Sequence, residues 1–131
     1  MNRPGTLAEV ARRVNDGTQK FELALREFLD SFYMNPAERQ SMINDEPEPL
    51  TDIKKHAALG GVGEHLARRW KLRIPAWTED PSRFLKRPYF TTRLEDLKAM
   101  LLVQSPLAFR RRLIFTEAEP LRRARMPRDA A

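Results

Sequence analysis

The chain has 131 residues, of which 41% are hydrophobic and 32% are charged, so it can form one ordinary domain but not two of comfortable size. The formal net charge of +6 favours an anionic partner without identifying one. Because the chain has no cysteine, disulfide bonds, thiolate zinc sites and thiol nucleophiles are excluded.

The hydropathy pattern predicts a soluble, cytoplasmic protein that does not associate with membranes. No stretch of the chain approaches the 18 consecutive apolar residues of a membrane-spanning helix. The first residues, Met1 to Gly5, lead into a charged segment and not into the apolar core of a secretion signal.

Acidic and basic residues are distributed unevenly along the chain. Residues 1–52 hold six basic and ten acidic side chains, whereas residues 53–131 hold 18 basic and eight acidic ones. The proline-containing acidic stretch Glu46 to Pro49 is the best candidate for a linker between the two parts.

We therefore predict a single helical domain over residues 1–126. It would consist of an acidic part, 1–46, a linker, 46–50, and a basic part, 51–126, and residues 127–131 would form a frayed tail.

The N-terminal part predicts a long amphipathic helix with one weak point. Thr6 to Glu9 reads as a capping box, and apolar residues recur at helical spacing through residues 18–33. An unbroken helix over residues 6–34 would be about 43 Å long, more than a compact domain of this size spans comfortably. Either the helix breaks at Gly17, within the turn-like sequence Asn-Asp-Gly, or one end projects.

Further helix starts follow along the chain. Asn35 and Pro36 begin a short helix that ends before the linker, and Thr92 to Glu95 is a second capping box. The apolar stripe changes phase at Gly60 to Gly63, which predicts a break or kink in the helix that follows the linker. No alternating strand pattern of useful length appears, so the predicted fold is all-α with five to seven helices.

The apolar periodicity also predicts the core, with the two tryptophans packing the centre. The predicted core residues are Phe21, Leu25, Phe28, Leu66, Trp70, Trp77, Phe84, Leu97, Leu101, Phe109 and Leu113.

No combination of residues in the sequence predicts catalysis, a metal site or a cofactor site. The two histidines, His56 and His65, are nine residues apart, whereas a helical metal-binding pair needs a spacing of three or four, so we read both as structural or surface residues. None of the four serines has a neighbouring base or lies in a nucleophile elbow. Gly60 to Gly63 follows a predicted helix and not a strand, which favours close helix packing or a kink over a phosphate-binding loop.

Two arginine clusters near the C-terminus stand out from this background. The candidate contact residues are Arg110, Arg111, Arg112, Arg122, Arg123 and Arg125. Three interpretations remain open: a solvated face with ion pairs to the acidic N-terminal part, recognition of phosphate groups by the guanidinium forks, or docking to an acidic protein.

Three segments, Glu64 to Trp70, Pro75 to Pro81 and Ser105 to Phe115, resemble a family of small bacterial proteins associated with toxin–antitoxin-like gene pairs. The other member of such a pair is nucleotidyltransferase-like. The resemblance covers about the second half of the chain and carries no catalytic motif. It implies a helical accessory protein or an antitoxin-like partner.

The sequence thus favours a non-enzymatic helical binding module, antitoxin-like, whose partner protein is encoded nearby. The partner would be held through the basic C-terminal region or the long N-terminal helix. The alternative is a protein that binds DNA or RNA through the two arginine clusters. The apolar stripe from Phe21 to Phe32 can either pack internally or form a homodimer interface.

Overall fold

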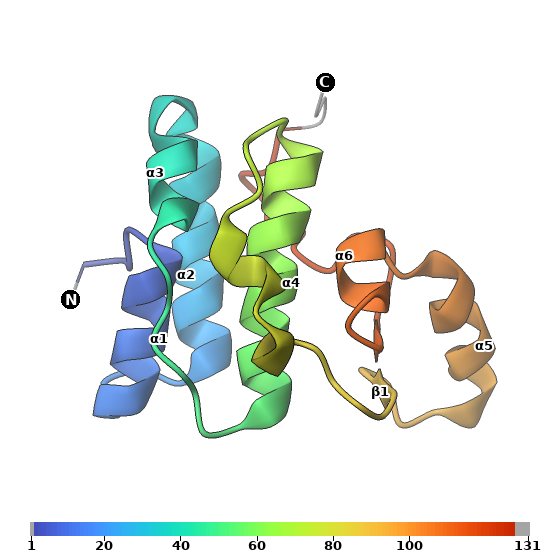
Figure 1. Cartoon of the computed structure of the whole chain (residues 1–131). Coiled ribbons are helices and arrows are strands. Elements are labelled where there is room, and N and C mark those ends of the chain that lie inside the picture. The colour runs from blue at the N-terminus through green and yellow to red at the C-terminus, as the bar shows by residue number, and fades with distance from the viewer. Residues whose placement is uncertain (1, 128–131) are drawn as a thin grey trace.

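The computed structural model describes residues 2–127, and helices dominate them (Figure 1). The α-helices are α1 (Leu7–Asp16), α2 (Phe21–Met34), α3 (Arg39–Asn44), α4 (Ile53–Arg69), α5 (Glu95–Gln104) and α6 (Leu107–Arg110). Short 3-10 turns lie at Pro36–Glu38, Ala76–Glu79 and Pro81–Arg83. The described residues therefore confirm the all-α class, with six α-helices inside the predicted range.

One small pair of strands accompanies the helices. β1 (Tyr89–Phe90) and β2 (Ile114–Phe115) run parallel, with Tyr89 opposite Ile114 and Phe90 opposite Phe115. Each strand has only two residues, too few to give the alternating pattern by which strands are predicted from sequence. The pair fixes the chain on both sides of α5 to one another.

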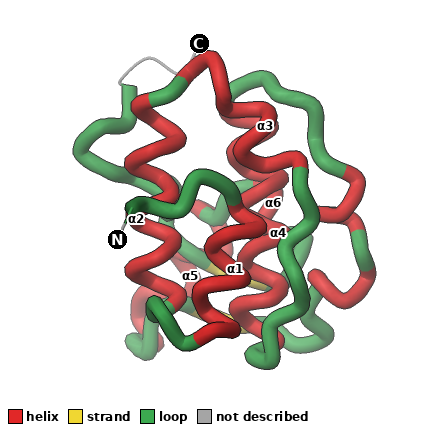
Figure 2. Tube along the Cα trace, turned by 90° about the vertical axis from the view of Figure 1, so that its left-hand side faces the viewer, coloured by secondary structure: helices red, strands yellow, loops and turns green. Residues whose placement is uncertain are grey.

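Helix α4 lies at the centre of the molecule. In Figure 1, α1, α2 and α3 lie on one side of it, and α5, α6 and the strand pair lie on the other. The tube view from the side shows α1 and α2 as neighbouring helices joined by a short turn (Figure 2). The arrangement lets α4 contribute to the core on most of its circumference.

The N-terminal helix breaks at Gly17, one of the two alternatives the sequence left open. Gly17 adopts the left-handed conformation with φ of 76°, and its N–H group lies at the carbonyls of Arg13 and Val14. This is the usual end of a helix at glycine, the residue that adopts positive φ without a steric cost. The alternative of one long helix with a projecting end is therefore wrong.

The expected break at Gly60 to Gly63 is also wrong, because α4 is continuous through all four residues. The other expectation for these glycines, close helix packing, is confirmed. A Cβ atom on Gly61 would lie 2.8 Å from the Phe109 ring, and one on Gly63 would lie 2.9 Å from the Trp77 ring. The apolar stripe changes phase because α6 and the 3-10 turns cover α4 on a second face.

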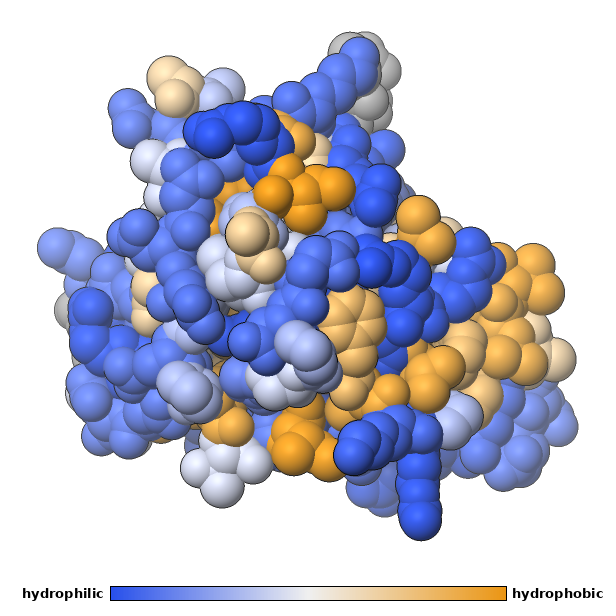
Figure 3. Space-filling view, in the orientation of Figure 1, coloured by the Kyte–Doolittle hydropathy of each residue, from blue (hydrophilic) through white to orange (hydrophobic). Residues whose placement is uncertain are grey.

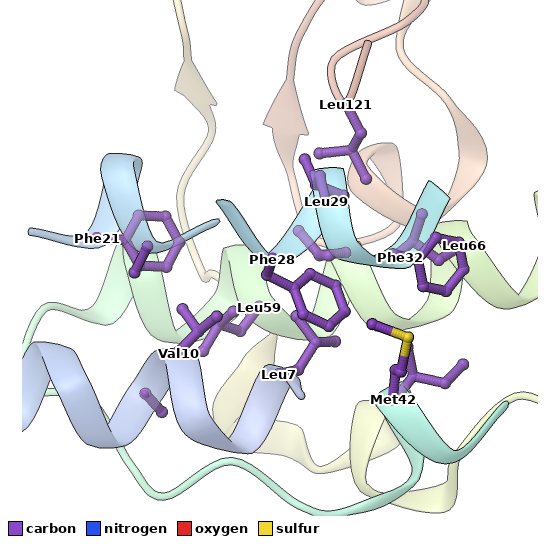
Figure 4. Close-up of a cluster of buried hydrophobic side chains, with 14 of the residues drawn as sticks. Leu7, Val10, Phe21, Phe28, Leu29, Phe32, Met42, Leu59, Leu66 and Leu121 are labelled. Carbon is purple, nitrogen blue, oxygen red and sulfur yellow. The ribbon is translucent and has the colours of Figure 1, made fainter. Parts of the chain in front are cut away.

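The core joins residues from all parts of the chain, and Figure 4 shows Phe28 surrounded by side chains of α1, α2 and α4. Of the predicted core residues, six are buried: Phe21, Phe28, Leu66, Trp77, Leu101 and Phe109. Four are partly buried: Leu25, Trp70, Phe84 and Leu113. Only Leu97 is wrong, since its side chain is 38% exposed on α5.

The predicted linker is an extended segment between α3 and α4, and it is packed against the rest of the protein. Pro47 and Leu50 are buried. The guanidinium of Arg83, itself 1% exposed, donates hydrogen bonds to the carbonyls of Pro47, at 2.8 Å, and of His56, at 3.1 Å. The linker is therefore attached to α4 and to the turn at Pro81–Arg83.

Within residues 2–127, no helix has the length and apolar character that crossing a membrane requires. The predicted tail, 127–131, lies outside the described residues except for Pro127.

Candidate partner-binding surfaces

The structure places the six candidate arginines in three different environments. Arg112 is fully buried, so its prediction as a contact for a partner is wrong. It lies just after α6, where its guanidinium donates to Glu64 Oε1 at 2.6 Å and to the carbonyls of Ala108 and Thr78. The three-arginine run looked like one solvated face, but the helix ends at Arg110 and the chain then turns inward.

Glu64 is the acceptor at the centre of a buried ion cluster. It lies on α4, is 0% exposed, and accepts hydrogen bonds from Arg68, Arg111 and Arg112 at 2.6–2.7 Å. Burial by itself raises the pKa of this carboxyl, but the hydrogen bonds from the three arginines outweigh burial and lower the pKa to about 2. Arg111 also pairs with Glu79, at 2.9–3.0 Å.

The second arginine cluster lies beside the C-terminal end of α4. Arg123 forms a two-point ion pair with Asp30 of α2, with Nε and Nη2 each 3.0 Å from a carboxylate oxygen. These hydrogen bonds lower the pKa of Asp30. Arg122 has a 70% exposed side chain and lies 3.9 Å from Glu119, beyond hydrogen-bond distance. Arg125 is also exposed.

A hollow of about 680 Å³ lies at this end of the molecule, and we call it the arginine hollow. Its lining residues are Arg69, Glu119, Arg122, Arg123, Ala124, Met126 and Pro127. Arg69, in the last turn of α4, donates to Glu119 at 2.7 Å. Neither residue was among the sequence candidates. The sequence feature that could have identified Arg69 was its position, with Arg68, at the end of a helix. Cations are common there for electrostatic reasons alone, so this position does not by itself indicate a binding site.

Arg110 lies elsewhere, on α6. It is exposed, and no described carboxylate forms an ion pair with it. The two sequence clusters therefore do not form one continuous basic patch. The predicted pairing of the arginines with the acidic N-terminal part holds for Arg123, while Arg111 and Arg112 pair with glutamates of the basic part.

An exposed apolar surface covers α5 and the start of α6, and we call it the α5 surface. Its members have side chains 38–79% exposed: Leu94, Leu97, Met100, Leu102, Val103 and Leu107. In Figure 3 this region forms the cluster of orange side chains on the right, where Figure 1 places α5. Within α5 only Leu101 is buried, so the helix is apolar on faces that nothing in the described chain covers.

The structure also brings together a serine and a histidine that are 26 residues apart. His56 Nε2 lies 2.8 Å from Ser82 Oγ, and Ser82 Oγ lies 2.8 Å from Asp80 Oδ1. The reading that no serine has a neighbouring base was therefore wrong for Ser82. Sequence spacing gave no signal, because the contact depends on the turn at Pro81–Arg83 packing against α4.

The direction of the hydrogen bonds decides what this pair can do. The Leu50 N–H group points at His56 Nδ1, at 3.3 Å, so in the neutral ring the proton resides on Nε2. Nε2 then donates to Ser82, and the Ser82 hydroxyl donates to Asp80. Burial and then the charge of Arg83 lower the pKa of His56, which keeps the ring neutral near pH 7. A general base needs the opposite proton arrangement, so the chain of bonds holds the turn at Ser82 instead.

Ser82 lines a second hollow, of about 720 Å³, between the start of α4 and the loop 81–89. Its other polar lining residues are the cations Lys54, Lys86 and Arg87 and the phenol of Tyr89. The rest of the lining is apolar, without the convergent acid, base and nucleophile of a hydrolytic site.

The ring of His65 packs against that of Phe109, with the two planes tilted by 51° and the centroids 5.7 Å apart, and burial lowers the pKa of His65. It lies far along α4 from His56, in agreement with two separate structural roles. Between residues 2 and 127, no group of three or more histidine, aspartate or glutamate side chains is placed to hold a metal ion. Compared with known proteins, the chain matches no protein-family profile, no curated sequence and no solved structure.

Proposed function

We propose that the chain is a non-enzymatic helical binding module that holds a partner protein on its α5 surface. The observation that carries this proposal is the exposure of six large apolar side chains on and next to one helix. A folded domain rarely exposes a contiguous apolar patch of this kind unless it is a binding surface, because exposing apolar area to water is unfavourable.

The composition of the surface fits a protein partner. Protein interfaces have an apolar centre and a polar rim. Val103, 79% exposed, and Met100 lie on one side of α5, and the acidic residues Glu95 and Asp96 lie at its start. Arg110 follows Leu107 by three residues on α6, so a cation borders the apolar surface at its other end.

The resemblance to bacterial accessory proteins supports the identity of the partner. We propose that the partner is encoded by the adjacent gene and is a nucleotidyltransferase-like toxin, which the chain neutralises as an antitoxin-like protein. The binding surface differs from both regions that the sequence favoured. The apolar stripe of α2 packs internally through Phe21, Phe28 and Phe32. Of the six candidate arginines, carboxylates bind Arg111, Arg112 and Arg123.

Co-purification with the product of the adjacent gene tests the proposal. The double variant Met100→Glu and Val103→Glu places charge in the centre of the α5 surface, and we expect binding to weaken by about 30-fold or more, as for other interface centres. Leu23→Glu on α2 is the matched control, because Leu23 is 44% exposed and Met100 is 47% exposed. The control should bind like the wild type and relieve toxicity of the neighbouring protein equally well.

Two results would contradict the proposal. One is a tagged protein that emerges without the neighbouring gene product and does not relieve its toxicity. The other is equal binding by the double variant and the Leu23→Glu control. If the wild-type chain is instead a dimer by size-exclusion chromatography and the double variant is a monomer, the α5 surface binds a second copy.

A further inference from the structure

The arginine hollow is a second candidate surface, separate from the α5 surface. Its three arginines come from two segments more than 50 residues apart: Arg69 ends α4, and Arg122 and Arg123 lie near the C-terminus. Figure 1 shows the C-terminal segment (red) beside the upper end of α4. Folding thus gathers cations that the sequence keeps apart.

Two of the arginines are held in place before any ligand arrives. Asp30 binds Nε and Nη2 of Arg123, and Glu119 binds Nη2 of Arg69. Their remaining N–H groups have no partner among the described residues. A guanidinium that is already oriented loses less conformational entropy on binding an anion than a free one does.

Donors exceed acceptors around this hollow. Among the residues that line it, Arg69 has a buried Nε with no hydrogen-bond partner in the described part of the chain. The Arg69 guanidinium also lies over the Trp70 ring, 5.8 Å from its centroid. A ligand that supplies several acceptor oxygens fits this imbalance, and phosphate is such a ligand.

Two further arginines lie near the hollow without lining it, Arg3 and Arg125, which is more positive charge than a single small anion would use. Arg3 and Arg125 both donate to Met34 Sδ, one turn beyond Asp30 on α2, so they lie beside the arginine that Asp30 binds. Asp30 and Glu119 are the carboxylates that pair with these arginines in the described chain. The cations belong to three separate segments, so their spacing suits an extended chain of negative charges.

The lining favours phosphates over an acidic protein. The apolar lining residues are limited to Ala124, Met126 and Pro127, whereas a protein interface centres on large apolar side chains, as the α5 surface does. Glu119 lies in the hollow and repels an anion, and an incoming phosphate would share Arg69 with it. Arg122, with its 70% exposed side chain, is the arginine with the most donors left for the ligand.

We infer that the arginine hollow binds phosphodiester groups of a nucleic-acid backbone, with Arg122 as the main contact and Arg69 and Arg123 as oriented supports. This assignment does not depend on the partner proposed for the α5 surface. It differs from the linear clusters in the sequence, because Arg112 is buried, Arg110 lies elsewhere and Arg69 joins the site.

Fluorescence anisotropy with the full chain tests the inference. The probes are labelled oligonucleotides of about 20 nucleotides, as single-stranded DNA, duplex DNA and single-stranded RNA, titrated at about 50 and about 200 mM salt. The three probes distinguish the possible sources of the phosphates. Loss of one phosphate contact should make the change in affinity between these salt concentrations about 3.5-fold smaller for the duplex and about 2.6-fold smaller for a single strand. We expect this result for Arg122→Gln.

Arg110→Gln is the matched control, since it removes the same charge from another exposed arginine and leaves the hollow unchanged. It should keep the wild-type salt slope. The inference is overturned if no probe binds at the lower salt concentration, or if both variants lower the slope equally. Displacement of the oligonucleotide by poly-glutamate at the same concentration of charge would assign the hollow to acidic proteins instead.

Discussion

At the scale of single residues, Glu64 is notable because it is a charged side chain with no contact with solvent. Its carboxylate is fully buried and shared by three arginines, one of which, Arg112, is itself fully buried. Removing one member of a buried ion cluster is costly because the opposite charge remains buried without its partner. The cluster therefore ties α4 to the segment that follows α6.

We predict that Glu64→Gln lowers the free energy of unfolding by about 3 kcal/mol, measured by urea denaturation. Gln keeps the shape of the side chain but leaves Arg112 without a counter-charge. Glu79→Gln is the control, because Glu79 pairs with Arg111 from a side chain that is 50% exposed, and it should cost less than about 1 kcal/mol. Equal effects of the two variants would contradict the special role of the buried carboxylate.

His56 gives a prediction for the dependence of stability on pH. Its pKa in the folded protein is lowered by burial and by Arg83, so as the pH falls below about 6.5 the unfolded chain takes up a proton first. The free energy of unfolding should therefore decrease between pH 7.5 and 5.5, as followed by urea midpoints. The pKa of His65 is lowered too, and its effect has the same sign.

Single and double variants separate the contributions of His56 and His65 to the pH dependence of the free energy of unfolding. His56→Gln should flatten part of the decrease, His65→Gln another part, and the double variant most of it. An undiminished decrease in the double variant would show that other groups cause it.

At the scale of elements, α4 depends on glycines for its contacts. A Cβ atom on Gly61 would meet the Phe109 ring of α6 at 2.8 Å, closer than side chains tolerate. We predict that Gly61→Ala lowers the free energy of unfolding by about 2 kcal/mol, although alanine is intrinsically the better helix former. Thermal melts of both variants check this, and Gly5→Ala, where nothing lies within 4 Å of the added Cβ atom, should change stability little.

The elements also show where sequence reasoning succeeds. The end of α1 at Gly17 follows from local backbone chemistry, and Thr6 accepts the N–H of Glu9 at 3.0 Å as a capping box requires. Continuity of α4 could not be predicted in this way, because it depends on the rings of Trp77 and Phe109 filling the space that the glycines leave. Likewise, α5 is apolar on several faces, so periodicity could not show that Leu101 would be buried and Leu97 exposed.

At the scale of the whole molecule, arginines that are neighbours in the sequence lie in different environments of the fold. The buried cluster at Glu64 and the pair between Arg123 and Asp30 neutralise arginines inside the fold. The arginines that can still bind a ligand lie in two separate places, on α6 and around the arginine hollow. The sequence identified the basic C-terminal region, but which arginines remain available depends on contacts between residues 47–93 positions apart.

The buried guanidinium of Arg83 has a consequence for how the protein acts. Its hydrogen bonds to the carbonyl of Pro47, within the segment 46–50, and to that of His56, on α4, prevent this segment from serving as a hinge between the acidic part, 1–46, and the basic part, 51–126. Both candidate surfaces lie in the basic part, and the arginine hollow also depends on the acidic part, because Asp30 of α2 orients Arg123. A nucleic acid bound in the arginine hollow would therefore meet an Arg123 whose supporting carboxylate cannot move away with α1, α2 and α3.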